Sequence, residues 1–307
     1  MTQQNFPYAF FQGKIIPVKQ AKVSIMTNAL QYGTGLFGGI RGYLAEDGKG
    51  VNIFRLSDHY TRFLQSMRII NKTIKYSHQE LVSITMELVK KNQPKTDCYL
   101  RPIAYAANLG ISPDLSVADF DFAVYMIPLG EYLSLDKGLK LMVSSWVRTS
   151  DSMIPARAKI TGGYINSALA KAEAARHGCD DALMLTASGH VAEGSAANLF
   201  IVRNGALITS EKTADVLEGI TRKSMLELTG DLGIPVEERE IDRTEIYVAD
   251  EAFLSGTGVQ VAWIKEVDGR VIGDGRLGRL SGRLKQKFFD IVRGRENKYK
   301  DWLTKIY

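Results

Sequence analysis

Short apolar runs, typical of β-strands, alternate along this chain with stretches in which apolar residues recur at helical spacing. Near the N-terminus two apolar arms flank Gln12-Gly13, which predicts a hairpin. Further runs at 98–107 and 121–128 predict two more strands. Within the first of these, Tyr99 and Arg101 are two residues apart, so we expect their side chains on one face of the strand.

Helix starts are also readable in the first half of the chain. Ser57 or Asp58 is expected to be the N-cap of a helix that continues to about residue 70. Ser77 is followed three residues later by Glu80, which is the capping-box pattern, and predicts a helix over 77–92.

The second half continues this mixture of strands and helices. It offers a strand-like run at 139–146, a helix over 165–177, strands joined at Ser188-Gly189 and Asn204-Gly205, a helix opening at 219–221, and an apolar run at 252–261. Pro128 and Gly138 bracket a connecting segment. We therefore expect a small α/β domain over 1–128, an interdomain loop over 129–138 and a large domain over 139–307.

Composition places the chain among ordinary globular proteins. It has 307 residues, 45% hydrophobic and 24% charged, and no apolar run approaches the length of a membrane span. The first residues lack the layout of a secretion signal, so we expect a cytoplasmic protein. Cys98 and Cys179 fit neither a disulfide framework nor a metal motif, and we expect no metal.

The net charge of +5 is concentrated near the C-terminus. There Leu280, Leu284, Phe288 and Val292 recur at helical spacing, and basic residues occupy the remaining faces. This pattern is typical of a solvated helix face, so we expect no nucleic-acid or membrane partner.

A literal G-x-G-x-x-G lies at Gly33, Gly35 and Gly38. A dinucleotide site would need a strand before the motif and a crossover helix after it. No strand leads into Gly33, and the turn at 46–50 follows too soon for such a helix. The context therefore argues against a nicotinamide-dependent dehydrogenase.

Lys159 lies in the passage between the strand-like run at 139–146 and the helix at 165–177. Its neighbours are Ala158 and Ile160, and two glycines follow that let backbone approach a ligand. A poorly solvated lysine is held near neutrality and condenses with aldehydes. A solvated surface lysine is the alternative that this pattern leaves open.

Three other features accompany this lysine. Glu193 has little charge around it, so a buried carboxylate there requires either an arginine or a cationic ring nitrogen as its partner. The helix opening at Ile220-Thr221 and the loop at 255–258 present backbone amides and hydroxyls, as a phosphate requires. Arg62 is either a snorkelling surface arginine or an inward anion ligand. Together these features make a phosphate-bearing aldehyde a coherent ligand.

In combination, several motifs resemble those of the branched-chain amino-acid aminotransferases, which are fold-type IV pyridoxal-phosphate enzymes. The similarity runs from about Gly13 to about Gly275 and includes Q-Y-G-T-G-L-F-G-G-I-R, Y-L-R, K-I-T-G-G-Y, E-G-S-A-A-N-L-F, L-E-G-I-T-R and S-G-T-G. The resemblance implies a two-domain α/β and α+β fold like that of D-amino-acid aminotransferase, whose larger C-terminal domain carries a mixed, barrel-like sheet.

The resemblance also implies roles for individual residues. Lys159 matches the lysine that binds pyridoxal 5'-phosphate covalently, Tyr164 the tyrosine at its phenolic oxygen, and Glu193 the acid at its pyridine nitrogen. The phosphate ligands correspond to Arg62, Ile220, Thr221 and Thr257. The substrate pocket corresponds to Tyr32, Phe37, Tyr99, Arg101 and Tyr132, with Thr257 and Gly258 at the α-carboxylate.

The implied activity is transamination of the branched-chain L-amino acids leucine, isoleucine and valine with 2-oxoglutarate. The chain departs from the family at Gly38, where glutamate is usual, and at Gly163, where asparagine is frequent. D-amino-acid aminotransferase, R-selective amine transaminase and aminodeoxychorismate lyase share the same chemistry and are the nearest alternatives. The resemblance further implies a homodimer or higher homo-oligomer, with residues near Val117 reaching a partner's pocket.

Overall fold

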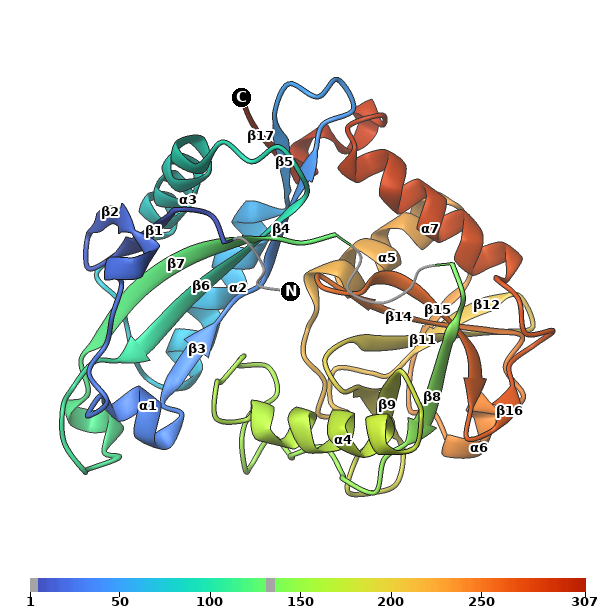
Figure 1. The fold of residues 1–307 in the computed structure, drawn as a ribbon. Helices are drawn as coiled ribbons and strands as arrows, with labels where there is room; N and C mark the ends of the chain where they lie inside the picture. The colour runs from blue at the N-terminus through green and yellow to red at the C-terminus, as the bar shows by residue number, and fades with distance from the viewer. Residues whose placement is uncertain (1–4, 131–135) are drawn as a thin grey trace. The chain divides into compact units, whose positions relative to one another are not determined.

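The computed structural model describes residues 5–130 and 136–307, which form two compact units (Figure 1). Unit 1 comprises residues 1–130, 158–162 and 289–307, and unit 2 comprises residues 131–157 and 163–288. Both units are discontinuous along the chain, whereas the sequence predicted two continuous domains joined by a loop over residues 129–138. That division into folding domains stays a prediction.

Unit 1 is built on an antiparallel sheet. Among its described residues the strand order is β17 (Leu303–Ile306), β5 (Val51–Phe54), β4 (Ile40–Leu44), β6 (Cys98–Ala106), β7 (Phe120–Pro128), β1 (Tyr8–Phe11) and β2 (Lys14–Pro17), and β3 (Gly35–Phe37) pairs with β6. The helices are α1 (Asn28–Tyr32), α2 (Leu56–Ile69) and α3 (His78–Asn92), with 3-10 turns η1 (Val18–Gln20), η2 (Leu115–Val117) and η3 (Asn297–Trp302). The core joins apolar side chains of α2 and α3 to those of the sheet, including Leu36, Phe63, Leu88, Leu100 and Phe122.

Local chemistry explains one hairpin and one helix start in unit 1. The predicted hairpin forms at Gln12 and Gly13, whose φ angles of 47° and 83° are the left-handed values that such a turn requires. The Ser77–Glu80 capping box is present, as predicted.

The expected N-cap of α2 was wrong. The helix begins at Leu56, and its N-cap is Arg55 in a left-handed conformation with no side-chain cap. The Arg55 guanidinium lies 3.7 Å from the centroid of the Trp302 ring and forms an ion pair with Asp58 at 3.1 Å. A contact with a residue far along the chain therefore sets the start of this helix.

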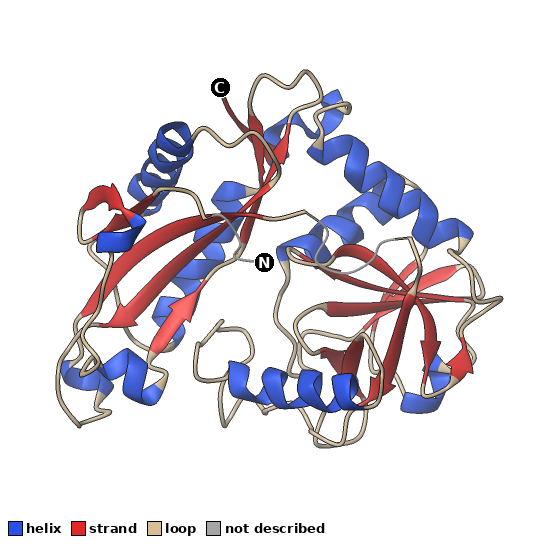
Figure 2. Ribbon diagram, in the orientation of Figure 1, coloured by secondary structure: helices blue, strands red, loops and turns tan. Residues whose placement is uncertain are grey.

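Unit 2 contains a mixed sheet. Among its described residues the order is β10 (Val191–Gly194), β9 (Asp181–Leu185), β8 (Leu139–Val143), β15 (Gln260–Val267), β14 (Glu251–Gly256), β11 (Asn198–Arg203), β12 (Ala206–Thr209) and β13 (Val236–Glu238), with β16 (Arg270–Val271) on β15. β8 runs parallel to β9 and β15, β12 runs parallel to β13, and the other pairs are antiparallel. Figure 2 shows this sheet curling rather than lying flat.

The described residues of unit 2 include the helices α4 (Tyr164–Arg176), α5 (Ile220–Asp231) and α6 (Arg243–Ile246), and α7 (Arg279–Val292) begins in unit 2 and ends in unit 1. The C-terminal helical spacing was correct, because Leu284, Phe288 and Val292 are all buried in α7. The expected hairpins at Ser188-Gly189 and Asn204-Gly205 join β9 to β10 and β11 to β12. Among the described helices, none has the length and apolar character needed to cross a membrane.

Candidate active site

Lys159 lies between β8 and α4, as the sequence predicted, in a short extended segment that belongs to unit 1. The segment adds to β3: Phe37 N donates to Lys159 O at 3.0 Å, and Thr161 N donates to Gly35 O at 2.8 Å. Gly33 adopts a φ of 66°, and a Cβ built there would lie 2.6 Å from Gly162 Cα. The two glycines let the strands approach, which fixes the half-buried Lys159 at the edge of the sheet.

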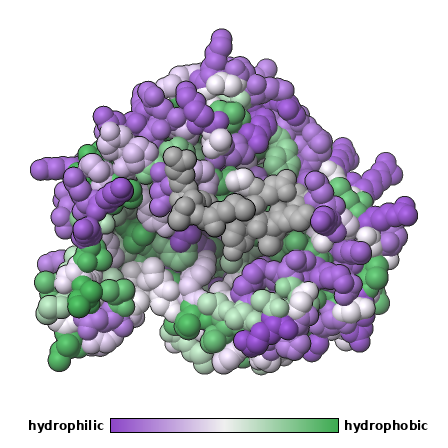
Figure 3. All heavy atoms as spheres, in the orientation of Figure 1, coloured by the Kyte–Doolittle hydropathy of each residue, from purple (hydrophilic) through white to green (hydrophobic). Residues whose placement is uncertain are grey.

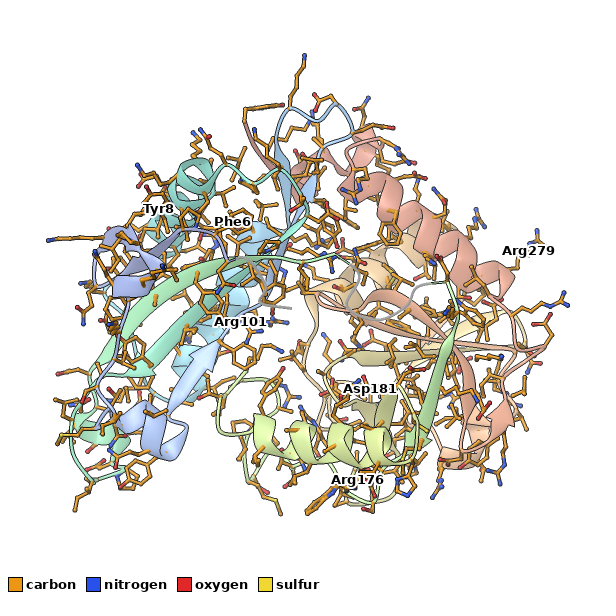
Figure 4. The ribbon with its side chains drawn as sticks, in the orientation of Figure 1. Phe6, Tyr8, Arg101, Arg176, Asp181 and Arg279 are labelled. Atoms are coloured by element: carbon orange, nitrogen blue, oxygen red, sulfur yellow. The ribbon has the colours of Figure 1, made fainter. Side chains whose placement is uncertain are left out.

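The side chains of Lys159 and Arg101 meet on one aromatic ring. Lys159 Nζ lies 5.1 Å from the centroid of the Phe37 ring, and the Arg101 guanidinium carbon lies 4.5 Å from the same centroid. Arg101, labelled in Figure 4, also lies 5.1 Å from the Tyr99 centroid and donates to Tyr99 Oη at 3.1 Å. The predicted placement of Tyr99 and Arg101 on one face is therefore confirmed.

Arg101 is a cation whose charge the described residues do not neutralise. Its side chain is half-buried, no ion pair to an acidic residue is formed within residues 5–130 and 136–307, and its Nε is buried without a hydrogen-bond partner. A buried guanidinium nitrogen without an acceptor is costly. The arrangement suits an anionic group supplied by a ligand.

Two glycines, Gly38 and Gly39, pack against the side chains of Pro102 and Tyr99. A Cβ on Gly39 would overlap Tyr99, lying 2.8 Å from Tyr99 Cζ, and a Cβ on Gly38 would lie 2.7 Å from Pro102 Cγ. Gly38 N also donates to Pro102 O at 2.8 Å. Glycine at 38 and 39 therefore lets β6 and its aromatic side chains lie close to the turn between β3 and β4.

Arg62 lies on α2, half-buried, one turn after the buried His59. Burial, followed by the positive charges of Arg62, Lys159 and Arg55, holds the pKa of His59 well below its ordinary value. His59 is therefore neutral at physiological pH. The positive charges of Arg62 and Lys159 both lower the pKa of this buried imidazole, and positive charge of this kind suits an anion-binding region.

For two of the predicted pocket residues, Tyr32 and Tyr132, the described residues show no contact with Lys159 or Arg101. Tyr32 is 41% exposed on α1, and its Oη donates to Ile111 O at 2.6 Å. Tyr132 lies outside the described residues.

In unit 2, Glu193 is almost fully buried on β10. Its Oε1 forms an ion pair with Arg148 Nη2 at 2.8 Å. Its Oε2 accepts from Asn198 Nδ2 at 2.9 Å and from Leu217 N at 3.3 Å. Of the two partners left open by the sequence, the described structure supplies an arginine.

Asn198 connects Glu193 to the start of α5. Its Nδ2 also donates to Leu217 O at 2.9 Å, and its Oδ1 occupies the space that a Cβ on Gly219 would need. Gly219 is the N-cap of α5, which has no side-chain cap, and Ile220 and Thr221 are buried in its first turn. The first amides of such a helix have no intrahelical acceptor and favour a phosphate.

The remaining predicted residues of unit 2 lie at the end of one hairpin and at one helix start. Ser255 on β14 pairs with Asn198 on β11, so the two side chains share a face of the sheet. Ser255 Oγ is buried and has no hydrogen-bond partner among the described residues. Thr257 and Gly258 form the turn into β15, and Tyr164 is the first residue of α4.

Sequence reasoning missed Arg148 and Asn198. Asn198 stands in the E-G-S-A-A-N motif, but only the structure shows its amide on the Glu193 carboxylate. Arg148 follows the strand-like run at 139–146, and its position carries no local signal for an ion pair with Glu193. The signal that was available is chemical: a buried glutamate requires donors.

Comparison with known proteins shows the family to which the chain belongs. Residues 35–267 match the family described as amino-transferase class IV. A protein of Aquifex aeolicus (strain VF5), named probable branched-chain-amino-acid aminotransferase, is 45% identical over 304 residues, which are 99% of this chain and 98% of that protein.

Two solved structures are similar over nearly their whole length. The branched-chain aminotransferase from the archaeon Thermoproteus uzoniensis, with norvaline, gives a TM-score of 0.94 at 41% identity and covers 98% of this chain and 99% of its own. The branched-chain amino acid aminotransferase from Thermobaculum terrenum, in its PLP-bound holo-form, gives 0.94 at 37% identity and covers 99% of this chain and 100% of its own. The expected fold-type IV architecture is confirmed, and this chain belongs to the class IV aminotransferases, among the branched-chain amino-acid aminotransferases.

Proposed function

We propose that this chain transfers the amino group of leucine, isoleucine or valine, as L-amino acids, to 2-oxoglutarate, with pyridoxal 5'-phosphate as cofactor. The products are the branched-chain 2-oxo acids and L-glutamate. The observation that carries this proposal is the shared ring of Phe37: a lysine amine lies 5.1 Å from its centroid and an arginine without an acidic partner among the described residues lies 4.5 Å from it. A reacting amine and a carboxylate-binding group thus flank one apolar side chain.

Each unit contains polar and charged groups whose chemistry fits this cofactor. In unit 2, the uncapped start of α5 offers backbone amides to a phosphate, and the buried Ser255 hydroxyl is without a partner among the described residues. Glu193 is a buried carboxylate suited to a cationic ring nitrogen. In unit 1, Arg62 adds positive charge next to a neutral His59.

The family resemblance assigns a role to each proposed cofactor ligand. Bound pyridoxal phosphate supplies a ring that accepts the electrons released when the substrate Cα loses its proton. Lys159 Nζ attaches the cofactor and then carries that proton, as a base and afterwards as an acid. Glu193 keeps a proton on the ring nitrogen, and Tyr164 donates to the phenolic oxygen. Arg62, Thr257 and the amides of Ile220 and Thr221 bind the phosphate.

Substrate selection is assigned to the aromatic side chains and to Arg101. Tyr32, Phe37, Tyr99 and Tyr132 give apolar surface to a branched side chain. Arg101, whose guanidinium lies over the rings of Phe37 and Tyr99, donates to the distal carboxylate of glutamate or 2-oxoglutarate, because it forms no ion pair with an acidic residue of the described chain. The turn at Thr257-Gly258 receives the α-carboxylate. The same set of residues then serves both substrates of a ping-pong reaction.

A Lys159→Ala variant tests the proposal. We expect a folded protein whose leucine:2-oxoglutarate turnover falls by on the order of 10⁴-fold, because the proton carrier is removed. Borohydride reduction of the native holoenzyme, followed by peptide mapping, should place the cofactor on Lys159. Normal turnover in the variant, or a label on another lysine, would refute the assignment.

A panel of amino donors separates this activity from its nearest alternatives. Leucine, isoleucine and valine are expected to react faster than D-alanine and R-1-phenylethylamine when 2-oxoglutarate is the acceptor. Faster reaction with the D-amino acid or the R-amine would assign the chain to the D-amino-acid or amine transaminases instead.

The proposed homodimer is supported by an apolar surface on unit 1. The segments 23–32 and 108–117 lie side by side, since Gln31 Nε2 donates to Gly110 O at 2.8 Å and Thr27 forms an isolated antiparallel β-bridge with Leu109. Green spheres gather at the lower left of Figure 3, over α1 and the loop after β6. The exposed apolar side chains there are Val23, Ile25, Met26, Leu30, Leu109, Ile111 and Val117.

Such a contiguous patch is unusual on a monomer, and we assign a second copy of this chain to it. Ile25 and Ile111 are 84% and 86% exposed, so aspartate at either position is tolerated by the fold and opposes association. Sedimentation should show a dimer for the native chain and for Val271→Asp, an exposed control outside the patch, and monomers for Ile25→Asp and Ile111→Asp. A monomeric native chain would contradict the assignment.

A further inference from the structure

The Arg148 side chain is held in one position by three contacts within unit 2. Its Nη2 lies 2.8 Å from Glu193 Oε1, its Nη1 donates to Ser167 Oγ at 3.3 Å, and its Nε donates to Asp215 O at 3.3 Å. Its backbone amide donates to Leu185 O at 2.8 Å. The guanidinium is thus oriented from β10, from α4 and from the loop before α5, and the backbone of Arg148 is attached to the end of β9.

The two oxygens of Glu193 have different partners. Oε1 faces the Arg148 cation, whereas Oε2 accepts from two neutral donors, the Asn198 amide and the Leu217 backbone. The side chains of Arg148 and Glu193 are 11% and 4% exposed. A buried ion pair of this kind contributes little to stability, because desolvation offsets its attraction. The pair therefore points to a role in chemistry.

We infer that Arg148 is a positioning residue, whose cation keeps Glu193 ionised and makes its carboxylate the weaker base toward the cofactor ring nitrogen. The inference rests on the proposed pairing of Glu193 with that nitrogen. A cation in contact with a carboxylate lowers its affinity for a proton. The proton shared by Glu193 and the ring then lies on the nitrogen, where it makes the ring an electron acceptor.

Nitrogen NMR of the holoenzyme tests this inference without measuring activity. Apoprotein is reconstituted with pyridoxal phosphate labelled with ¹⁵N in the ring, and the free cofactor at low and high pH supplies the protonated and unprotonated reference shifts. The native holoenzyme should give the protonated shift. Arg148→Met and Arg148→Gln should each move the ¹⁵N shift toward the unprotonated reference by more than half the difference between the two references. Arg148→Lys keeps the positive charge, so its ¹⁵N shift should lie close to that of the native holoenzyme.

Asn198→Ala is the matched control, because it removes a neutral donor from the same carboxylate and should leave the ring protonated. Glu193→Gln distinguishes a failure of the proposed pairing of Glu193 with the ring nitrogen from a failure of the role of Arg148. A native shift in Glu193→Gln would overturn the proposed pairing itself. A changed shift in Glu193→Gln with a native shift in folded Arg148→Met or Arg148→Gln would overturn only the role of Arg148. Equal changes of the ¹⁵N shift in Asn198→Ala and in the Arg148 variants would also overturn the role of Arg148, because they would show that the loss of any contact with Glu193 has the same effect as the loss of the charge.

Discussion

Removal of the Arg101 guanidinium should separate the two substrates of the reaction. The Arg101→Met variant keeps an unbranched side chain over Phe37 and Tyr99 but loses the donors that we assign to the distal carboxylate of glutamate. Branched-chain donors have no distal carboxylate. The half-reaction with glutamate should therefore slow, while the half-reaction with leucine is nearly unchanged.

The structure sets the size of this effect. Arg101 is half-buried and forms no ion pair within the described chain, so a ligand carboxylate receives a charge-assisted hydrogen bond that water does not replace well. Such bonds contribute about 1.5–3 kcal/mol, which corresponds to about a 10- to 150-fold change in kcat/KM. The loss of the cation above the two rings, about 0.5–1 kcal/mol, applies equally to both substrates and cancels in their ratio.

Rapid mixing of the holoenzyme with glutamate or leucine, followed through cofactor absorbance, measures each half-reaction separately. Arg101→Lys is the matched control: it keeps the charge without the planar fork and should lie between the native chain and Arg101→Met. An equal fall for glutamate and leucine would refute the assignment, because it would show that Arg101 supports the pocket without recognising the distal carboxylate.

Three further predictions concern stability. Gly39→Ala places a methyl group 2.8 Å from Tyr99 Cζ and should lower the unfolding free energy by about 1–3 kcal/mol in urea titration. Hydrogen bonds from two serines hold the pKa of Glu173 below its ordinary value of 4.5, so this carboxylate stabilises the fold above that pH. Glu173→Gln should lower the melting temperature at neutral pH, and the difference should shrink as the pH falls below 4.5. Ser77→Ala removes the capping hydroxyl from Glu80 N and should cost about 1 kcal/mol by the same urea titration.

The sequence by itself determined the features that depend on neighbours along the chain. The Gln12-Gly13 and Asn204-Gly205 hairpins follow from residues that tolerate left-handed φ, and the Ser77 capping box follows from a contact three residues away. The placement of Lys159 between a strand and a helix was readable for the same reason. The family motifs, once recognised, supplied the fold and the cofactor.

Tertiary structure alone decided which side chains meet. Arg55 is the N-cap of α2, and its guanidinium packs on Trp302, which lies far along the chain. The shared ring of Phe37 depends on a segment after β8 pairing with β3, and the Arg148–Glu193 ion pair joins elements that are far apart in sequence. Long-range pairs of this kind leave no periodicity in the chain, because each partner is chosen by burial and charge in the folded core.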